Sequence, residues 1–111
     1  MTIAQLHTLH AEGHSIGVHT SWHRLLICMR EEELRAELEQ GLLWVRQEFG
    51  EHHAVLAYPD GRSSPRIRAL ARDLGYRCGL GVGALRAQLD LFDLPRHFVT
   101  MAWSPSQLAP A

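Results

Sequence analysis

The sequence predicts an α/β fold around a parallel β-sheet, because short apolar segments alternate with amphipathic helical segments along its 111 residues. Residues 54–58 (AVLAY) are almost all apolar, as is typical of a strand covered on both faces. Residues 31–49 carry apolar side chains every three or four positions, which predicts a long helix with one buried face. Crossovers between parallel strands are right-handed, so the carboxyl ends of the strands are expected to share one edge of the sheet.

Three elements are predicted in the first half of the chain. Residues 1–13 are expected to form a helix and residues 15–19 a short strand. Three glutamates open the helix at 31–49, where they suit the positive end of the helix dipole, and Gly50 ends it. In the first predicted helix one side carries Ile3, Leu6, Leu9 and His10; in the second, the apolar stripe is Leu34, Leu38, Leu42, Val45 and Phe49.

The second half continues the alternation. After the strand at 54–58 comes a turn at 59–61, then a helix at 65–74 with Ser64 as its N-cap, then a strand at 76–80. The residues expected to be buried in this third helix are Ile67, Leu70, Ala71 and Leu74.

Beyond residue 80 the glycines predict irregular structure, with a helical turn around 84–89 and a last strand at 97–101. We expect one domain over residues 1–103 and a frayed tail over 104–111.

Composition excludes several classes of protein. A net charge of −1, with no basic excess on one face, argues against a nucleic-acid partner. No apolar run is long enough to span a membrane. The N-terminus lacks the pattern of a signal peptide, so the chain as written is expected in the cytoplasm. Its two cysteines do not make a disulfide framework.

Two histidines stand four residues apart in His19-Thr20-Ser21-Trp22-His23, directly after the first predicted strand. Imidazoles at this spacing can face one point and bind one ion, and they suit zinc. The same spacing also occurs where histidines only cap a helix or fill a polar pocket. Two imidazoles alone do not complete a zinc site, which takes three or more protein ligands.

A second polar segment, Tyr58-Pro59-Asp60-Gly61, follows the strand at 54–58. It is either a plain strand-to-helix turn or a turn that presents a backbone N–H to a developing oxyanion.

Together, these segments resemble the polysaccharide deacetylase family, carbohydrate esterase family 4. Residues 11–23 (AEGHSIGVHTSWH) are similar to the helix end, strand and H-[ST]-x-x-H motif of that family. Residues 56–61 (LAYPDG) are similar to its AYPxG motif, residues 69–78 to its A-x-x-x-G-Y step, and residues 94–96 to its LPR segment. The resemblance covers about residues 5–100 of the chain.

The resemblance implies a parallel-stranded, partial and distorted (β/α) barrel that removes acetyl groups from carbohydrate polymers by metal-activated water. It implies a divalent metal, most often zinc, at His19 and His23, and an oxyanion donor at the backbone N–H of Asp60. Tyr58, Pro59 and Gly61 then belong to the substrate-binding turn. The partner it implies is an acetylated polysaccharide or oligosaccharide.

Trp22, within the H-[ST]-x-x-H segment, either lines a sugar subsite or packs beside the metal. Arg96 is a candidate for the charge that orients a catalytic base. His97 is either a general acid or an ordinary strand residue.

One departure from the family pattern matters most. The family's first motif, an Asp pair, lies N-terminal to the matched region, and no residue here fills the roles of base and metal carboxylate. Two hypotheses remain: a deacetylase whose N-terminal piece is absent or supplied elsewhere, and an inactive remnant with a vestigial two-histidine site. In both cases metal should be held weakly, and the open sheet edge at 15–18 should favour self-association.

The remaining histidines are expected to face solvent. The first predicted helix carries His7, His10 and His14 at spacings of three and four residues, and we interpret them as part of a solvent-exposed face, not as a second metal site. His52 and His53 precede a strand and are expected to be solvated.

Overall fold

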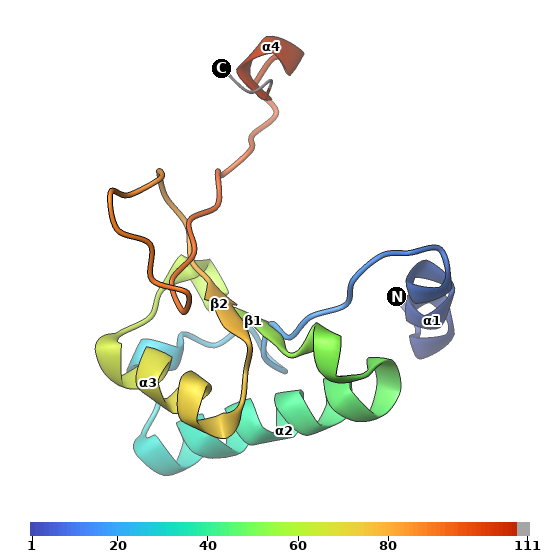
Figure 1. The fold of residues 1–111 in the computed structure, drawn as a ribbon, viewed down its shortest axis with the longest axis vertical. Coiled ribbons are helices and arrows are strands. Elements are labelled where there is room, and N and C mark those ends of the chain that lie inside the picture. The colour runs from blue at the N-terminus through green and yellow to red at the C-terminus, as the bar shows by residue number, and fades with distance from the viewer. Residues whose placement is uncertain (109–111) are drawn as a thin grey trace.

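The computed structural model describes residues 1–108. Its helices and strands follow the order α1 (Ile3–Ala11), α2 (Glu31–Phe49), β1 (Val55–Ala57), α3 (Pro65–Leu74), β2 (Cys78–Leu80) and α4 (Pro105–Leu108). Figure 1 shows β1 and β2 at the centre, with α2 and α3 packed against them. Helices α1 and α4 stand apart from this body at two different ends of the molecule.

The sheet is parallel, as predicted, with Leu56 of β1 paired with Gly79 of β2. An isolated parallel bridge joins Val18 to Leu56 on the outer side of β1. A second bridge joins Leu80 to Leu94 on the outer side of β2. The order across the sheet is therefore the segment around Val18, β1, β2 and the segment around Leu94, and the sheet is open.

The first and last strands are shorter than the sequence predicts. The expected strand at 15–19 makes only the Val18 bridge, and the expected strand at 97–101 does not form. The chain pairs instead at 94–96, where the amide of Leu94 donates to the Gly79 carbonyl and the amide of Gly83 to the Arg96 carbonyl. Pro95 is tolerated between them because an edge strand leaves alternate N–H positions unpaired. Residues 97–101 have strand propensity but no neighbour to pair with.

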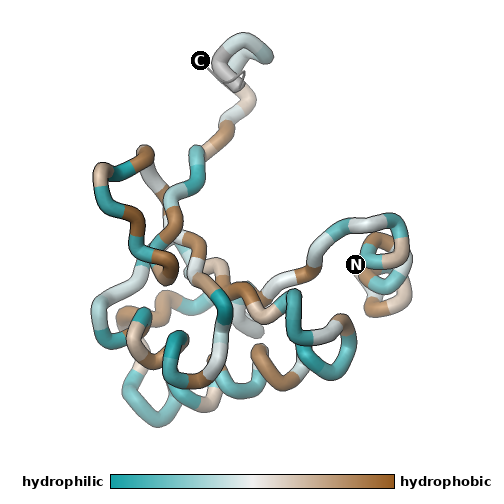
Figure 2. The backbone as a smooth tube through the Cα atoms, in the orientation of Figure 1, coloured by the Kyte–Doolittle hydropathy of each residue, from teal (hydrophilic) through white to brown (hydrophobic). Residues whose placement is uncertain are grey.

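Helix α2 supplies one wall of the core. Its bounds are those predicted, and all five residues of its predicted apolar stripe are buried. Figure 2 shows the same division, with brown apolar stretches on the central strands and on turns of α2 and α3. The buried hydroxyl of Tyr76 donates to the Leu38 carbonyl at 2.7 Å, which ties the start of β2 to α2. Helix α3 also matches its prediction, with the Ser64 side chain accepting from the Ile67 amide and Gly75 in the left-handed region.

Helix α1 is attached differently. It begins with a capping box between Thr2 and Gln5, but no residue in it is fully buried. Ile3, on the predicted apolar side, is 53% exposed, and of the apolar residues in α1 only Leu6 packs partly against the core. The helix therefore buries little apolar surface against the body.

Another prediction beyond residue 80, the helical turn around 84–89, is wrong. Residues 84–89 form bends without a helical turn, although Arg86 within them is paired with Asp93 at 2.7 Å. The predicted frayed tail at 104–111 contains the helical turn α4, while residues 109–111 lie outside the described part of the chain. Among residues 1–108, no helix is both long and apolar enough to cross a membrane.

Candidate functional site

A cavity of about 310 Å³ lies at the carboxyl edge of the sheet, where the predicted site residues were expected to gather. It collects residues that follow the segment at Val18, β1, β2 and the segment at Leu94. Its lining is His19, His23, Tyr58, Asp60, Val82, Arg96, His97, Phe98 and Val99. The parallel sheet thus brings both predicted motifs to one place.

The rings of the two motif histidines contact each other in the lining of this cavity. Their ring centroids are 4.7 Å apart and the rings meet edge to face at 67°. The carbonyl of Ala57, at the end of β1, accepts a hydrogen bond from Nδ1 of His19 at 2.9 Å. Because that bond requires a proton on Nδ1, the neutral His19 ring carries its lone pair on Nε2. A backbone partner on the second ring nitrogen is the usual way in which a protein orients a metal-binding imidazole.

The backbone at this site is held in an uncommon conformation. Thr20, His23 and Asp60 are the only residues other than glycine with positive φ in residues 1–108, at +67°, +55° and +54°. Such conformations cost free energy in residues with a Cβ, and they gather at ligand-binding sites. The hydroxyl of Thr20 accepts a hydrogen bond from the His23 amide at 3.1 Å, which closes the turn between the two histidines.

The Asp60 turn follows directly from β1. The Gly61 amide donates to the Tyr58 carbonyl at 2.8 Å and the Arg62 amide to the Pro59 carbonyl at 3.1 Å. Within residues 1–108, the amide of Asp60 has no hydrogen-bond acceptor. An unpaired amide beside a cavity is the feature that an oxyanion donor needs.

The other residues of this turn are packed against the body of the protein. The side chain of Tyr58 is 0% exposed, and its hydroxyl donates to the Phe92 carbonyl at 2.5 Å. Burial raises the pKa of this phenol. Pro59 is buried as well, and a Cβ on Gly61 would lie 2.5 Å from a methyl of Val82. The Tyr58 side chain is therefore placed to hold the turn, because a ring in the core cannot reach substrate.

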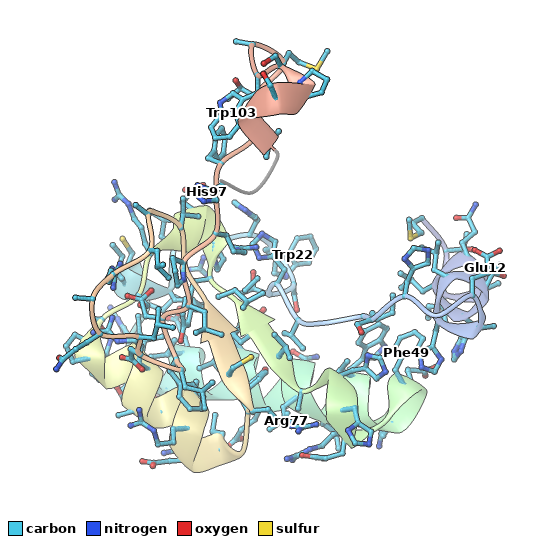
Figure 3. All side chains as sticks on the ribbon, turned by 45° about the horizontal axis from the view of Figure 1, so that its top comes forward. Glu12, Trp22, Phe49, Arg77, His97 and Trp103 are labelled. Atoms are coloured by element: carbon cyan, nitrogen blue, oxygen red, sulfur yellow. The ribbon has the colours of Figure 1, made fainter. Side chains whose placement is uncertain are left out.

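Trp22 lies beside the histidine pair and does not pack. The residue is 82% exposed, so it packs little against the described part of the chain. Figure 3 shows Trp22 and His97 at the same end of the molecule, with the indole directed away from the body.

Arg96 and His97 form the far wall of the cavity. The guanidinium of Arg96 donates through Nε to the Gly81 carbonyl at 2.8 Å, so it is anchored on the glycine-rich segment after β2. His97 is exposed, lies outside any strand, and has its ring 6.3 Å from that of Trp103. Arg96 makes no ion pair with a carboxylate within the described chain.

A second, larger cavity of about 460 Å³ also includes His19 and runs along the backbone of residues 17–21 toward α2. The carboxylate of Glu37 in α2 accepts from the Ser21 amide there and braces the histidine turn. Across residues 1–108, no group of three or more His, Cys, Asp or Glu side chains is arranged to hold a metal ion. The histidine pair supplies two donors, which is fewer than a complete zinc site has.

Comparison with known proteins agrees with the motifs. Residues 2–79, more than half of the chain, match the sequence model of the polysaccharide deacetylases. The chain belongs to the polysaccharide deacetylase family. A search of curated proteins gave no significant match.

This deacetylase-family chain also resembles a solved structure, the Streptococcus pyogenes deacetylase PplD in complex with acetate, with a TM-score of 0.84 and 23% sequence identity. The match covers 97% of this chain and 49% of that one, so the chain spans about half the length of the structure it resembles. The likeness places the open parallel sheet within a deacetylase fold. Closure into a barrel stays a prediction.

Three supporting residues escaped the sequence reasoning. Ala57 orients His19 through a backbone carbonyl, and no residue pattern reports such a contact. Glu37 lies in the middle of α2 and looks like any solvated glutamate. Thr20 stands inside the recognised motif, and its hydroxyl three residues before the His23 amide is a pattern that could have predicted the turn.

Proposed function

We propose that this chain contributes a divalent-metal-binding histidine pair and an oxyanion-binding amide to a hydrolase that removes acetyl groups from carbohydrate. The observation that carries the proposal is the bond from Nδ1 of His19 to the Ala57 carbonyl, which leaves Nε2 of the neutral ring available to a metal in a ring 4.7 Å from that of His23. Zinc is the favoured ion because imidazole nitrogen suits it. The site needs a further donor, such as a carboxylate, from outside the described residues.

Each residue has a task that its position supports. His19 and His23 would hold the metal, which when bound polarises an acetyl carbonyl and acidifies a water molecule. The amide of Asp60 would donate to the oxygen of that carbonyl as negative charge develops on it. Arg96 places a positive charge at the cavity wall, fixed by Gly81, where it favours an anionic product such as acetate.

The substrate is proposed to be an acetylated polysaccharide or oligosaccharide. Trp22 supports this choice, because a large aromatic ring left 82% exposed beside the metal ligands offers a flat apolar face to a sugar ring. An N-acetyl amide or an O-acetyl ester would both fit the chemistry described.

The second candidate is a non-catalytic protein of the same fold that keeps only a vestigial metal site. It is favoured by the lack of a third ligand near His19 and His23 in residues 1–108. The two candidates share metal binding and differ in turnover.

Zinc binding tests what the two candidates share. We expect the purified chain to bind zinc weakly, and His19→Ala to lower the affinity at least about tenfold, because one of two donors is lost. Affinity should also fall on acidification, since protonated imidazoles do not bind metal. Isothermal titration calorimetry measures both effects.

His97→Ala is the matched control for this experiment, because His97 lines the same cavity outside the facing pair. It should bind zinc as the parent does. Equal affinity of the parent and His19→Ala would place the metal elsewhere and refute the proposed site.

A separate prediction concerns the outer edge of the segment at Val18. Val18 bonds to β1 through both its amide and its carbonyl, whereas the amides of Gly17 and His19 find no acceptor within residues 1–108. We propose that a second copy of the chain pairs with this edge, because unpaired strand edges associate. Sedimentation velocity should show dimers or larger species that increase with concentration; a monomer at every concentration would refute the edge pairing.

A further inference from the structure

The attachment of α1 to the body is made largely of histidines. Phe49, at the end of α2, has its ring 4.7 Å from that of His7 and 5.3 Å from that of His10. His53, in the short turn η2 (Glu51–His53), has its ring 4.8 Å from that of His10, edge to face. Figure 3 shows Phe49 on the side of the body that faces α1. His7 is exposed, as expected, whereas His10 and His53 are partly buried, so the expectation that these two face solvent is wrong.

The ring of His53 also accepts a hydrogen bond next to the β-sheet pairing at Val18. The Val18 amide donates to the Val55 carbonyl, as in an ordinary parallel pair. One rung earlier, the Ile16 amide donates at 3.1 Å to Nδ1 of the His53 ring. A side-chain nitrogen thus accepts a bond of the kind that a backbone carbonyl accepts at Val18.

Because a ring nitrogen takes the place of a backbone carbonyl, the hydrogen bond from the Ile16 amide depends on the protonation state of His53. Nδ1 accepts a hydrogen bond only when it carries no proton, so His53 must be neutral with its proton on Nε2. A protonated His53 would turn an N–H toward the N–H of Ile16. It would also place a positive charge against the ring of His10, 4.8 Å away.

The other charged groups at this contact do not reverse the effect. They are His7 from α1, Glu48 from α2, and Glu51 and His52 from the turn itself. The side chains of His7 and Glu48 are 2.9 Å apart, but this contact is exposed and therefore contributes little. The pKa of the Glu51 carboxyl is lowered chiefly by its hydrogen bond from Arg46, so Glu51 keeps its charge while imidazoles titrate.

We propose that His53 is a pH-sensitive latch that holds the segment at Ile16 and helix α1 on the body when neutral and releases both when protonated. Release begins directly upstream of Val18, in the segment that leads to His19. The latch is independent of the function proposed above, because it uses no residue of the cavity.

Amide exchange on the full chain tests the latch. Nuclear magnetic resonance gives a protection factor, corrected for the intrinsic exchange rate, for the amides of Ile16 and Val18. From about pH 7.5 to about pH 5.5 we expect the protection of Ile16 to fall about tenfold, and that of Val18, which bonds to a carbonyl, to stay constant. The midpoint for Ile16 should coincide with the titration of the His53 ring protons.

Two variants complete the experiment. His53→Asn offers an oxygen acceptor that does not titrate, and it should make the protection of Ile16 independent of pH. His52→Asn is the matched control, because His52 bonds to Arg77 and does not touch α1; it should keep the pH dependence of the parent. The proposal would be overturned if the protection of the Ile16 amide in the parent did not change with pH, or if the Val18 amide lost protection in parallel. Both outcomes are measured on the parent protein alone.

Discussion

Acetate release from N-acetylated chito-oligosaccharides by the 111-residue chain is expected to be slow or absent. The proposed metal-binding histidines, Asp60 and Arg96 line one cavity, but within residues 1–108 no carboxylate completes the proposed metal site. General-base assistance contributes about 10²–10⁴-fold to rate, and a missing ligand also weakens the ion that acidifies water. An oxyanion donor alone supplies only about 10²–10³-fold.

Adding an N-terminal strand that ends in two aspartates should raise the rate by about 10²–10⁴-fold if the chain is part of a deacetylase. The control is the same extension ending in two asparagines, which has equal size and no charge. His19→Ala in the extended protein should remove the gain. Rapid, metal-dependent acetate release by the 111-residue chain would refute the expectation, whereas no gain from the aspartates would favour the non-catalytic remnant.

Gly79→Ala is expected to destabilise the protein by about 3 kcal/mol or more, through overpacking and the loss of a buried hydrogen bond. An added Cβ would lie 2.2 Å from the Tyr58 hydroxyl oxygen and 2.8 Å from the Phe92 carbonyl oxygen. These are the two partners of the bond that holds the chain after β2 against the Asp60 turn. Urea denaturation followed by circular dichroism measures the loss.

Tyr58→Phe separates the two contributions to that loss. It removes the hydroxyl and should cost about 1–2 kcal/mol alone, because the Phe92 carbonyl then stays buried without its donor. Combined with Gly79→Ala, it should cost less than the sum of the single variants, since part of the clash disappears with the hydroxyl. Strict additivity, or a Gly79→Ala protein as stable as the parent, would contradict the packing described.

Sequence patterns predicted the features that depend on residue spacing and on the order of the elements along the chain. The bounds and buried stripe of α2 follow from a 3.6-residue repeat, and the cap at Ser64 follows from its place before Pro65. The meeting of His19 with Asp60 in one cavity follows from parallel strands, which align their carboxyl ends. These features need only the order of elements and the spacing of residues.

The failures share a different cause. The residues at 97–101 have strand propensity, but a strand needs a neighbour to pair with. The neighbouring segment of the chain, residues 79–83, already pairs with residues 94–96. The bond between Ile16 and His53 joins residues far apart in sequence, and neither periodicity nor propensity reports such a contact.

The left-handed backbone at Asp60 determines which residues can replace it. If only the backbone amide of this residue acts on substrate, its side chain can differ in charge and polarity. Branching at the Cβ is restricted, because the residue must adopt a positive φ. Glycine and asparagine adopt φ near +54° readily, whereas valine and isoleucine do so at a high cost. Variation at this position in related sequences should therefore follow backbone tolerance instead of charge or hydrogen-bonding capacity.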